Sequence, residues 1–276
     1  MAELPEVEII TQDLKKTIIG KKIKRIEEIC PENLRRKSSI GLNEILNKKI
    51  TSIKRRGKYI VISFSKGYSL LIHLGMTGHL FYKRGREPIN KHDLLIFDFL
   101  SGKNRLIYND IRRFGSVTVV DSAVLQKLNI FNKMGPEPLM VTKEEFLRIF
   151  RNRKSKIKSL LLDQKIIAGL GNIYADEALF QAKIHPEERA NTLSEKKLEM
   201  LRGSIKRILV KAIQEGGSTI INYCNLFGEE GKYQNYHKVY SRKGLPCALC
   251  GTTIEKIRVS QRSSFYCPKC QKKGNI

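Results

Sequence analysis

Two pairs of cysteines near the end of the chain restrict its fold more than any other sequence feature. Cys247 and Cys250 form the first pair, Cys267 and Cys270 form the second, and sixteen residues separate the two pairs. Two Cys-x-x-Cys pairs at this separation fit a tetrahedral site in which four thiolates fill every position around zinc. A fully ligated ion is structural rather than catalytic. We therefore expect one structural Zn²⁺ that supplies the folding free energy of this small unit.

Basic residues fill the segment between the two cysteine pairs. Lys256, Arg258 and Arg262, together with Gln261, predict a basic hairpin held by the metal. A zinc ribbon that contacts other proteins is the alternative. The whole chain carries 52 Lys and Arg against 27 Asp and Glu, a formal charge of +25. This excess favours a polyanion partner, most simply nucleic acid.

The size and composition of the chain favour a folded, multidomain protein. Its 276 residues are 41% hydrophobic, enough for two domains and a small appendage. A membrane surface is the competing polyanion, but the sequence has no long apolar span and no basic amphipathic anchor. We also find no signal peptide, and expect a cytoplasmic protein that binds no membrane. Cys30 and Cys224 stand apart from the cluster, so the cysteines do not indicate disulfides.

Short runs of β-branched and aromatic residues dominate the first half of the chain. A basic strand is predicted over residues 21–30. The other predicted strands cover residues 50–53, 59–64, 68–74, 94–99, 105–108 and 116–120. Short strands at this spacing, with Gly and polar turns between them, are typical of an antiparallel sandwich.

The composition changes after residues 135–139, a rigid Gly-Pro-Glu-Pro-Leu linker. Helices are predicted over residues 143–152, 166–183 and 194–215. Ser194 suits the N-cap of the last of these helices, which the two glycines at 216 and 217 end. Residues 222–240 carry little periodicity and contain two glycines and four tyrosines, which predicts a mobile loop.

The first eight residues, Met-Ala-Glu-Leu-Pro-Glu-Val-Glu, combine a helix start with a chemically useful terminus. Met1 precedes a small residue, so we expect its removal and a free α-amino group on Ala2. That amine titrates near pH 8 and is partly unprotonated at neutral pH, where lysines are not. Glu3 is a candidate proton partner for amine-based covalent catalysis. Pro5 suits the first position of a helix, and the alternative is a frayed terminus before an ordinary helix.

Seven stretches along nearly the whole chain are specific enough to carry a family resemblance. They are residues 3–8 (ELPEVE), 55–59 (RRGKY), 73–78 (HLGMTG), 108–115 (YNDIRRFG), 169–177 (GLGNIYADE), 216–219 (GGST) and 261–267 (QRSSFYC). With the cysteine cluster, they resemble the formamidopyrimidine-DNA glycosylase branch of the Fpg/Nei family. Members of this branch are base-excision-repair enzymes that remove oxidised purines.

The resemblance implies an α+β multidomain fold that binds DNA between its domains. An N-terminal antiparallel β-sandwich with flanking helices would cover residues 1–134, and a helix–two-turn–helix domain residues 135–222. A lesion-side loop over residues 223–238 and a zinc-finger β-hairpin over residues 239–276 would follow.

The resemblance also implies roles for three residues in catalysis. Glu3 matches the general acid/base at the lesion sugar. Lys58 matches the catalytic lysine that contacts the phosphates, although without the resemblance it reads as part of a solvated basic run. Arg262 matches the zinc-finger arginine that binds phosphates flanking the lesion and assists the second elimination.

Seven further residues match DNA contacts of the family. Met76, Arg112 and Phe114 match the side chains that fill the hole left by the flipped nucleotide, where stacking must be replaced. Without the resemblance, Met76 and Phe114 would more often be core residues. The matches to phosphate contacts are His92, Lys154, Lys158 and Asn172.

One position departs from the family. Its nucleophile is a proline immediately after Met1, and here that residue is Ala2. A secondary amine gives a permanently charged iminium, whereas a primary amine gives an imine that must be protonated before it draws electrons. Natural variation, a decayed paralogue and an engineered change are all compatible with this sequence.

The first functional hypothesis is a bifunctional DNA glycosylase/AP lyase that acts on oxidised purines opposite cytosine in duplex DNA. A lesion-binding protein that has lost the amine chemistry is the alternative from a different class. A zinc-ribbon RNA-binding protein is a distant third, because no aromatic stacking platform is recognisable. The expected partner is damaged double-stranded DNA, bound by a monomer.

Overall fold

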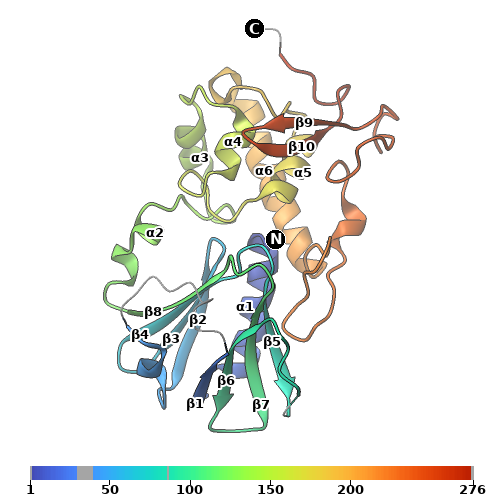
Figure 1. The fold of residues 1–276 in the computed structure, drawn as a ribbon. Coiled ribbons are helices and arrows are strands. Elements are labelled where there is room, and N and C mark those ends of the chain that lie inside the picture. Colours follow the sequence, from blue (N-terminus) through green and yellow to red (C-terminus); the bar gives the residue numbers. More distant parts are fainter. Residues whose placement is uncertain (1, 30–39, 86, 275–276) are drawn as a thin grey trace. The chain divides into compact units, whose positions relative to one another are not determined.

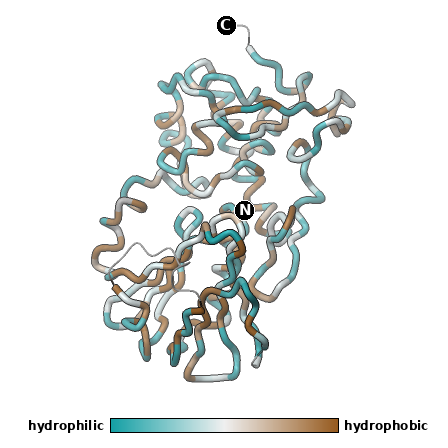
Figure 2. Tube along the Cα trace, in the orientation of Figure 1, coloured by the Kyte–Doolittle hydropathy of each residue, from teal (hydrophilic) through white to brown (hydrophobic). Residues whose placement is uncertain are grey.

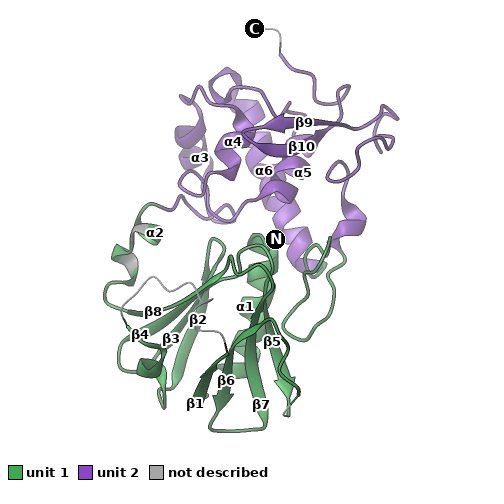
Figure 3. Cartoon of the chain, in the orientation of Figure 1, with its two compact units in different colours: residues 1–133, 215–232 green, residues 134–214, 233–276 purple. Residues whose placement is uncertain are grey.

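The computed structural model describes residues 2–29, 40–85 and 87–274. They form two compact units, which Figure 3 colours separately. Unit 1 contains residues 1–133 and 215–232, and unit 2 contains residues 134–214 and 233–276. The finer division into four segments made from the sequence remains a prediction.

Helix α1 (Leu4–Ile18) opens unit 1 where the sequence predicts a helix. Glu3 is its N-cap and Pro5 lies in the first turn. Glu6 accepts the N–H of Glu3 at 2.8 Å, and the two residues form the reciprocal pattern of a capping box. These contacts fix the entry into the helix and therefore the residue that precedes it.

Two four-stranded antiparallel sheets form the body of unit 1 (Figure 1), which confirms the predicted sandwich. The first sheet has the order β1 (Ile23–Glu28), β6 (Asp93–Phe99), β7 (Asn104–Asp110) and β5 (Gly78–Arg84). The second sheet has the order β2 (Ile50–Arg56), β3 (Tyr59–Phe64), β4 (Tyr68–His73) and β8 (Ser116–Asp121).

One hydrophobic core joins α1 and both sheets. Leu14, Ile60, Ile72, Phe97 and Leu106 are among its buried side chains. The hydropathy colouring in Figure 2 follows these strands as brown stretches. Strands and helix share this core, so they form a single rigid support for the loops at their ends.

The second sheet is covered on its other face as well. Val61, Leu71 and Val120 pack there against Leu125 and Phe131. The covering residues come from a short segment that holds the 3₁₀ turn η3 (Leu125–Lys127) and helix α2 (Asn129–Asn132). Burial on both faces explains why β3 and β4 read as nearly continuous apolar runs rather than as alternating ones.

The elements of unit 1 differ from the prediction in several places. Strand β5 is not predicted, because residues 78–84 alternate poorly and end in two basic side chains. Strand β2 runs three residues further than predicted, to Arg56. The predicted strand over residues 21–30 is β1, and Cys30 lies outside the described residues. A 3₁₀ turn, η2 (Leu42–Ile45), precedes β2.

Unit 2 packs four helices with a β-hairpin (Figure 1). The helices are α3 (Lys143–Phe150), α4 (Ile157–Leu162), α5 (Asn172–Gln181) and α6 (Glu195–Gln214), with 3₁₀ turns η4 (Ala190–Thr192) and η5 (Tyr233–Tyr236). The hairpin pairs β9 (Glu255–Val259) with β10 (Arg262–Tyr266). Ser194 caps α6 as predicted, because its hydroxyl accepts the N–H of Lys197 at 3.3 Å.

The predicted helix over residues 166–183 is wrong in its first part, because α5 begins only at Asn172. Gly169 has a φ of +81° and interrupts any helix there. The Gln164 side chain replaces helical bonds in this buried loop. It accepts the N–H of Gly169 at 2.8 Å and donates to the carbonyl of Leu170 at 2.9 Å. Helix α4 is too short to show a period and is not predicted.

Residues 215–232 leave unit 2 and belong to unit 1. The N–H of Lys232 donates to the carbonyl of Glu215 at 2.8 Å, so the segment begins and ends at one point. Asn225 holds a turn inside it by accepting the N–H groups of Phe227 and Glu229, both at 2.9 Å. The predicted mobility of residues 222–240 stays a prediction.

None of the helices in the described ranges is long and apolar enough to span a membrane.

Candidate functional site

One buried carboxylate organises the start of α1. Ala2 is half-buried, whereas Glu3 and Glu6 are buried. Besides the N–H of Glu3, Glu6 accepts the N–H of Ser218 at 2.9 Å through its other oxygen. The residue next to Ala2 and the turn at residue 218 therefore share one anchor. The positive end of the helix dipole lies here and favours both carboxylates.

A small pocket of about 110 Å³ opens beside Ala2 within unit 1. Its lining residues are Ala2, Met76, Thr77, Gly78, His79, Arg112, Ile221, Asn222 and Tyr223. The structure thus brings the predicted nucleophile together with two of the three predicted insertion residues. Burial raises the pKa of Tyr223, and the charges of Glu6 and Asp13 add to this rise. The phenol is therefore neutral at physiological pH.

His79 joins the pocket to the loop that follows residue 218. Its Nδ1 lies 2.9 Å from the carbonyl oxygen of Thr77, and its Nε2 lies against the carbonyl oxygen of Asn222. The ring stacks on Phe81 with a centroid distance of 5.7 Å. The sequence alone does not single out His79. The sequence contains little that could identify His79 as a site residue, because it is a single polar residue at the start of a strand that is not predicted.

Two close-packed loops hold the predicted insertion residues. Gly75 has a φ of +61°, and a Cβ there would lie 2.6 Å from the backbone of Phe114. Asp110 accepts the Thr77 hydroxyl at 2.7 Å and the N–H of Gly115 at 2.8 Å. The Thr77 hydroxyl in turn accepts the N–H of Arg112 at 2.9 Å. Only glycine fits at position 75, and the two loops are fixed to each other.

The predicted insertion residues project from these loops. Met76 is 40% exposed and Phe114 is 42% exposed, although both side chains are large and apolar. The Arg112 guanidinium lies 4.7 Å from the centroid of the Phe114 ring. Exposed apolar side chains on rigid loops, beside a cation, have the form of a wedge for stacked bases.

Lys58 lies in the turn between β2 and β3, half-buried, and follows Gly57 with its φ of +56°. Arg55 shapes this turn by donating to the Gly57 carbonyl at 3.0 Å. Arg55 also forms a 2.7 Å ion pair with Glu8 of α1. Neither Lys58 nor Glu3 lines the pocket beside Ala2. Their catalytic roles stay predictions.

The predicted phosphate contacts are partly exposed. Lys154 is exposed in the loop between α3 and α4, and Arg262 is exposed at the first residue of β10. Asn172 is half-buried at the first residue of α5, and its amide donates to the Ser263 carbonyl at 2.9 Å. His92 is half-buried just before β6.

The surroundings of Lys158 argue against the predicted direct contact with a phosphate. Its side chain is completely buried, and Nζ lies 2.6 Å from Oδ1 of Asp176, which is equally buried. Nζ also donates to the Ser263 carbonyl at 2.8 Å. Burial raises the pKa of Asp176 to about 6, and Lys158 opposes this rise. A buried, paired ammonium cannot reach a phosphate at the surface.

The Asp176 carboxylate connects α5 to the hairpin. It accepts the Ser264 hydroxyl at 2.8 Å and the N–H of Phe265 at 3.0 Å. Asn172 and Asp176 are four residues apart on α5 and therefore face the same strand, β10. Together with Lys158, they set the position of the strand that begins with Arg262. The sequence could not identify this network, because nothing in it distinguishes a buried lysine from a solvated one.

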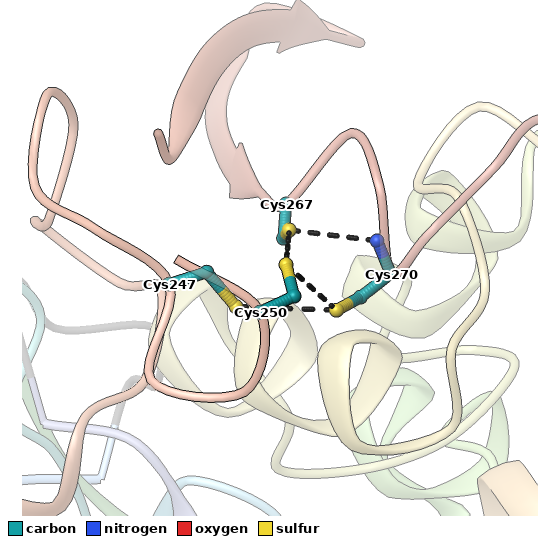
Figure 4. A group of neighbouring side chains, drawn as sticks. All are labelled: Cys247, Cys250, Cys267 and Cys270. Carbon is teal, nitrogen blue, oxygen red and sulfur yellow. Dashed lines mark hydrogen bonds between the residues drawn. The ribbon is translucent and has the colours of Figure 1, made fainter. Parts of the chain in front are cut away.

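Four cysteine sulfurs gather where the sequence predicts a metal site (Figure 4). All four lie within 4.8 Å of one another, with separations of 3.9 Å for Cys247–Cys270 and 3.5 Å for Cys250–Cys267. A tetrahedron with Zn–S bonds of about 2.3 Å has edges of about 3.8 Å. The four thiols therefore fit one zinc ion, with no open position for catalysis. Cys247 and Cys267 are buried against Phe180, Val239 and Ile254.

Three family profiles match consecutive parts of the chain. The N-terminal domain of formamidopyrimidine-DNA glycosylase matches residues 1–117, and the H2TH domain of the same enzyme matches residues 134–223. A zinc finger found in FPG and IleRS matches residues 244–273.

Full-length relatives and solved structures agree with these profiles. Formamidopyrimidine-DNA glycosylase of Ligilactobacillus salivarius is 41% identical over 98% of this chain and 99% of its own, and that of Pelotomaculum thermopropionicum is 42% identical over 99% of each. The fold also matches Lactococcus lactis Fpg in complex with DNA containing an abasic site. That match has a TM-score of 0.90 and 39% identity over 99% of this chain and 100% of the other. A complex of Lactococcus lactis FPG with FAPY-dG-containing DNA matches with a TM-score of 0.89 and 39% identity, over 98% and 100% of the two chains.

Proposed function

The chain belongs to the formamidopyrimidine-DNA glycosylase family, and we propose that it excises oxidised purines from damaged duplex DNA and then cleaves the strand as an AP lyase. The observation that carries this proposal is the pocket in which Ala2 meets Met76 and Arg112. The substrates are 8-oxoguanine and formamidopyrimidines opposite cytosine. The protein acts as a monomer in the bacterial cytoplasm.

The α-amine of Ala2 is the nucleophile once Met1 has been removed. In its unprotonated form it attacks C1′ of the lesion nucleotide, and the bond from C1′ to the base breaks. The departing base takes up the proton that the amine loses on attack, and Glu3 donates a proton to the sugar oxygen as the ring opens, which gives a protonated Schiff base. Ala2 supplies a primary amine, so this Schiff base can lose its remaining N–H proton, and the neutral imine that results must be protonated again before it accepts electrons. Activity is therefore slower than a proline would give.

The strand is cleaved from this Schiff base in two eliminations. Loss of a C2′ proton expels the 3′ phosphate, and a second elimination expels the 5′ phosphate. Lys58 and Arg262 stabilise the phosphates that leave. Neither residue lines the pocket beside Ala2, so their roles depend on the DNA that the protein binds.

Lesion access requires that the damaged nucleotide leave the stack. Met76 and Phe114 enter the vacated space and Arg112 reaches the orphaned base. The exposure of the two apolar side chains supports this role, since it leaves apolar surface on rigid loops that a stacked base can cover. Lys154, His92 and Asn172 contact backbone phosphates and set the register.

The zinc ion has a structural role. It holds the turns on either side of the β9–β10 hairpin, and its four thiolates leave no position for a substrate. DNA binding depends on it because the hairpin carries Arg262 at its tip, where Ser260 and Gln261 both have positive φ.

Borohydride trapping tests the proposed chemistry. Mass spectrometry first establishes that Ala2 is the N-terminus. The protein is then incubated with a duplex that contains one 8-oxoguanine, in the presence of borohydride, and the adduct is digested and mapped. We expect a covalent adduct on the N-terminal peptide and a faster reaction for Ala2→Pro. Glu3→Gln should bind the same duplex without releasing the base.

Two other results would change the assignment. An adduct on Lys58 would move the nucleophile to that residue. Intact lesion binding with no adduct and no base release would favour the alternative hypothesis, a family member that recognises damage without repairing it.

A further inference from the structure

A cavity of about 430 Å³ lies in unit 2 and takes no part in the proposed repair reaction. Residues of α5, α6, η5 and the zinc-binding segment line it. Its volume falls in the range of ligand pockets, about 300–1,000 Å³.

The cavity lies at the opposite end of α5 from the predicted phosphate contact. Asn172 is the first residue of α5, and Phe180, which lines the cavity, follows eight residues later. At 1.5 Å per residue this separation is roughly 12 Å along the helix axis. Neither Lys154 nor Arg262 is part of the lining. The cavity is therefore distinct from the predicted DNA contacts of unit 2.

The one acidic residue of the lining, Glu177, is committed to the protein itself. Its buried carboxylate accepts backbone N–H groups from Lys238, Val239 and Tyr240 at 2.8–3.1 Å. The carboxylate thus anchors the segment before the first cysteine pair. It leaves little capacity to attract a cationic ligand.

The charged residues that face the solvent around the cavity are cations. Arg207 and Lys211 lie one turn apart on α6, and Lys238 follows η5. The Arg207 guanidinium donates to the Ser204 hydroxyl at 3.2 Å and has no carboxylate partner in the described ranges. The positive charge that Arg207 brings to the rim is therefore not neutralised by a carboxylate of the described residues.

The floor of the cavity is apolar. Phe180, Ile208 and Tyr233 are buried there. Leu249 is 65% exposed and Tyr236 is 41% exposed at the rim, high values for large apolar side chains. An apolar recess with a cationic rim and exposed apolar edges is typical of a surface that receives an anchor side chain.

We propose that this cavity is a docking site for an acidic peptide segment of a partner protein, with one apolar or aromatic side chain inserted between α5, α6 and η5. The recess accommodates the anchor, and Arg207, Lys211 and Lys238 contact carboxylates on either side of it. Charge complementarity selects this occupant, since the rim attracts anions and the floor excludes them.

Single-stranded nucleic acid fits the same surface less well. Binding of a strand requires an aromatic ring with a face available for a base. The Tyr236 ring already has the Lys211 ammonium 4.8 Å from its centroid and the Tyr233 ring stacked at 6.0 Å. These contacts already use part of the ring surface on which a base would stack.

Fluorescence anisotropy with the full-length protein tests the proposal. The probe is a labelled peptide of four aspartates followed by Gly-Leu-Phe, at physiological salt. Arg207→Glu should weaken its binding about tenfold, since it reverses a charge on the rim. Lys196→Glu is the matched control, because it makes the same charge change at an exposed site of the same helix, and its effect should stay below about twofold. Gln181→Trp should weaken binding by filling the recess from an exposed position.

Two further measurements separate specific docking from general attraction to a basic protein. Replacing Leu and Phe of the peptide by Ser should weaken binding as much as Arg207→Glu does. The affinity of all variants for a duplex with an abasic-site analogue should stay within about twofold of the parent.

Three results would overturn the proposal. Equal losses for Arg207→Glu and Lys196→Glu would mean unspecific attraction to charge. Indifference to the Leu-Phe anchor would mean that the recess is not used. Displacement of the peptide by a single-stranded oligonucleotide, together with weaker duplex binding by Arg207→Glu, would assign the surface to nucleic acid.

Discussion

Replacing Lys158 by Met should destabilise unit 2 by several kcal/mol. The Lys158 ammonium is 2.6 Å from Asp176, and both side chains are completely buried. Met keeps most of the apolar stem of lysine and removes the charge, so the variant leaves a buried carboxylate without the cation that balances it. Removal of one partner from a buried ion pair costs about 3–5 kcal/mol.

The loss should depend on pH because Asp176 can take up a proton. Its pKa in the folded protein, about 6, lies above the ordinary value of 3.8, mainly because of burial. Asp176 therefore contributes stability below its unfolded-state pKa, and that contribution is lost as the pH rises through about 6. Lys158 lowers this pKa, so its removal raises it further. The destabilisation by Lys158→Met should be larger at pH 8 than at pH 5.

Urea denaturation followed by circular dichroism at both pH values measures the effect. Arg151→Met is the matched control, since Arg151 pairs with Glu195 at 3.1 Å but the side chains are 66% and 56% exposed. An exposed pair contributes at most about 1 kcal/mol. Equal, small losses for the two variants, or a lower salt slope of DNA binding for Lys158→Met, would refute the buried role and restore Lys158 as a phosphate ligand.

Three further outcomes follow from the site. Lys154→Ala should weaken duplex binding and reduce the log–log salt slope by about 0.9, whereas an unchanged slope would remove Lys154 from the phosphate contacts. Cys267→Ala should release zinc and abolish tight DNA binding while the sandwich of unit 1 stays folded, and full lesion binding after measured metal loss would contradict this. His79→Leu should lower affinity for an abasic-site duplex more than His79→Gln, since only the amide of Gln can still donate to the carbonyl of Asn222. Equal affinities of the two variants would mean that His79 does not position the loop that follows residue 218.

The zinc site and the fold class are predictable from the sequence because their signals are local. The spacing of four cysteines encodes the metal geometry directly, and the described sulfurs lie as that spacing requires. Strands β3 and β4 are recognisable because both of their faces are buried and they read as apolar runs. The start of α1 is recognisable from Pro5 and the two carboxylates around it.

The positions at which prediction from the sequence fails depend on contacts with residues that are distant in the chain. Lys158 pairs in the protein interior with Asp176, which lies eighteen residues further along the chain. No sequence pattern around either residue reveals this pairing. The start of α5 at Asn172 depends on Gly169 and on the side chain of Gln164, which satisfies the backbone of the preceding loop. His79 acquires its role from Asn222, 143 residues further along the chain.

The hydrogen bond from Ser218 to Glu6 spans 212 positions in the chain, and it has a consequence for synthesis on the ribosome. Helix α1 emerges first, but the second ligand of its capping carboxylate emerges only after α3, α4, α5 and α6 have been made. Residues 215–232 likewise complete unit 1 only at that stage. A nascent or truncated chain that ends before residue 218 therefore carries Ala2 without the turn that fixes its neighbour, and the surroundings of this proposed nucleophile are completed as one of the last steps of folding.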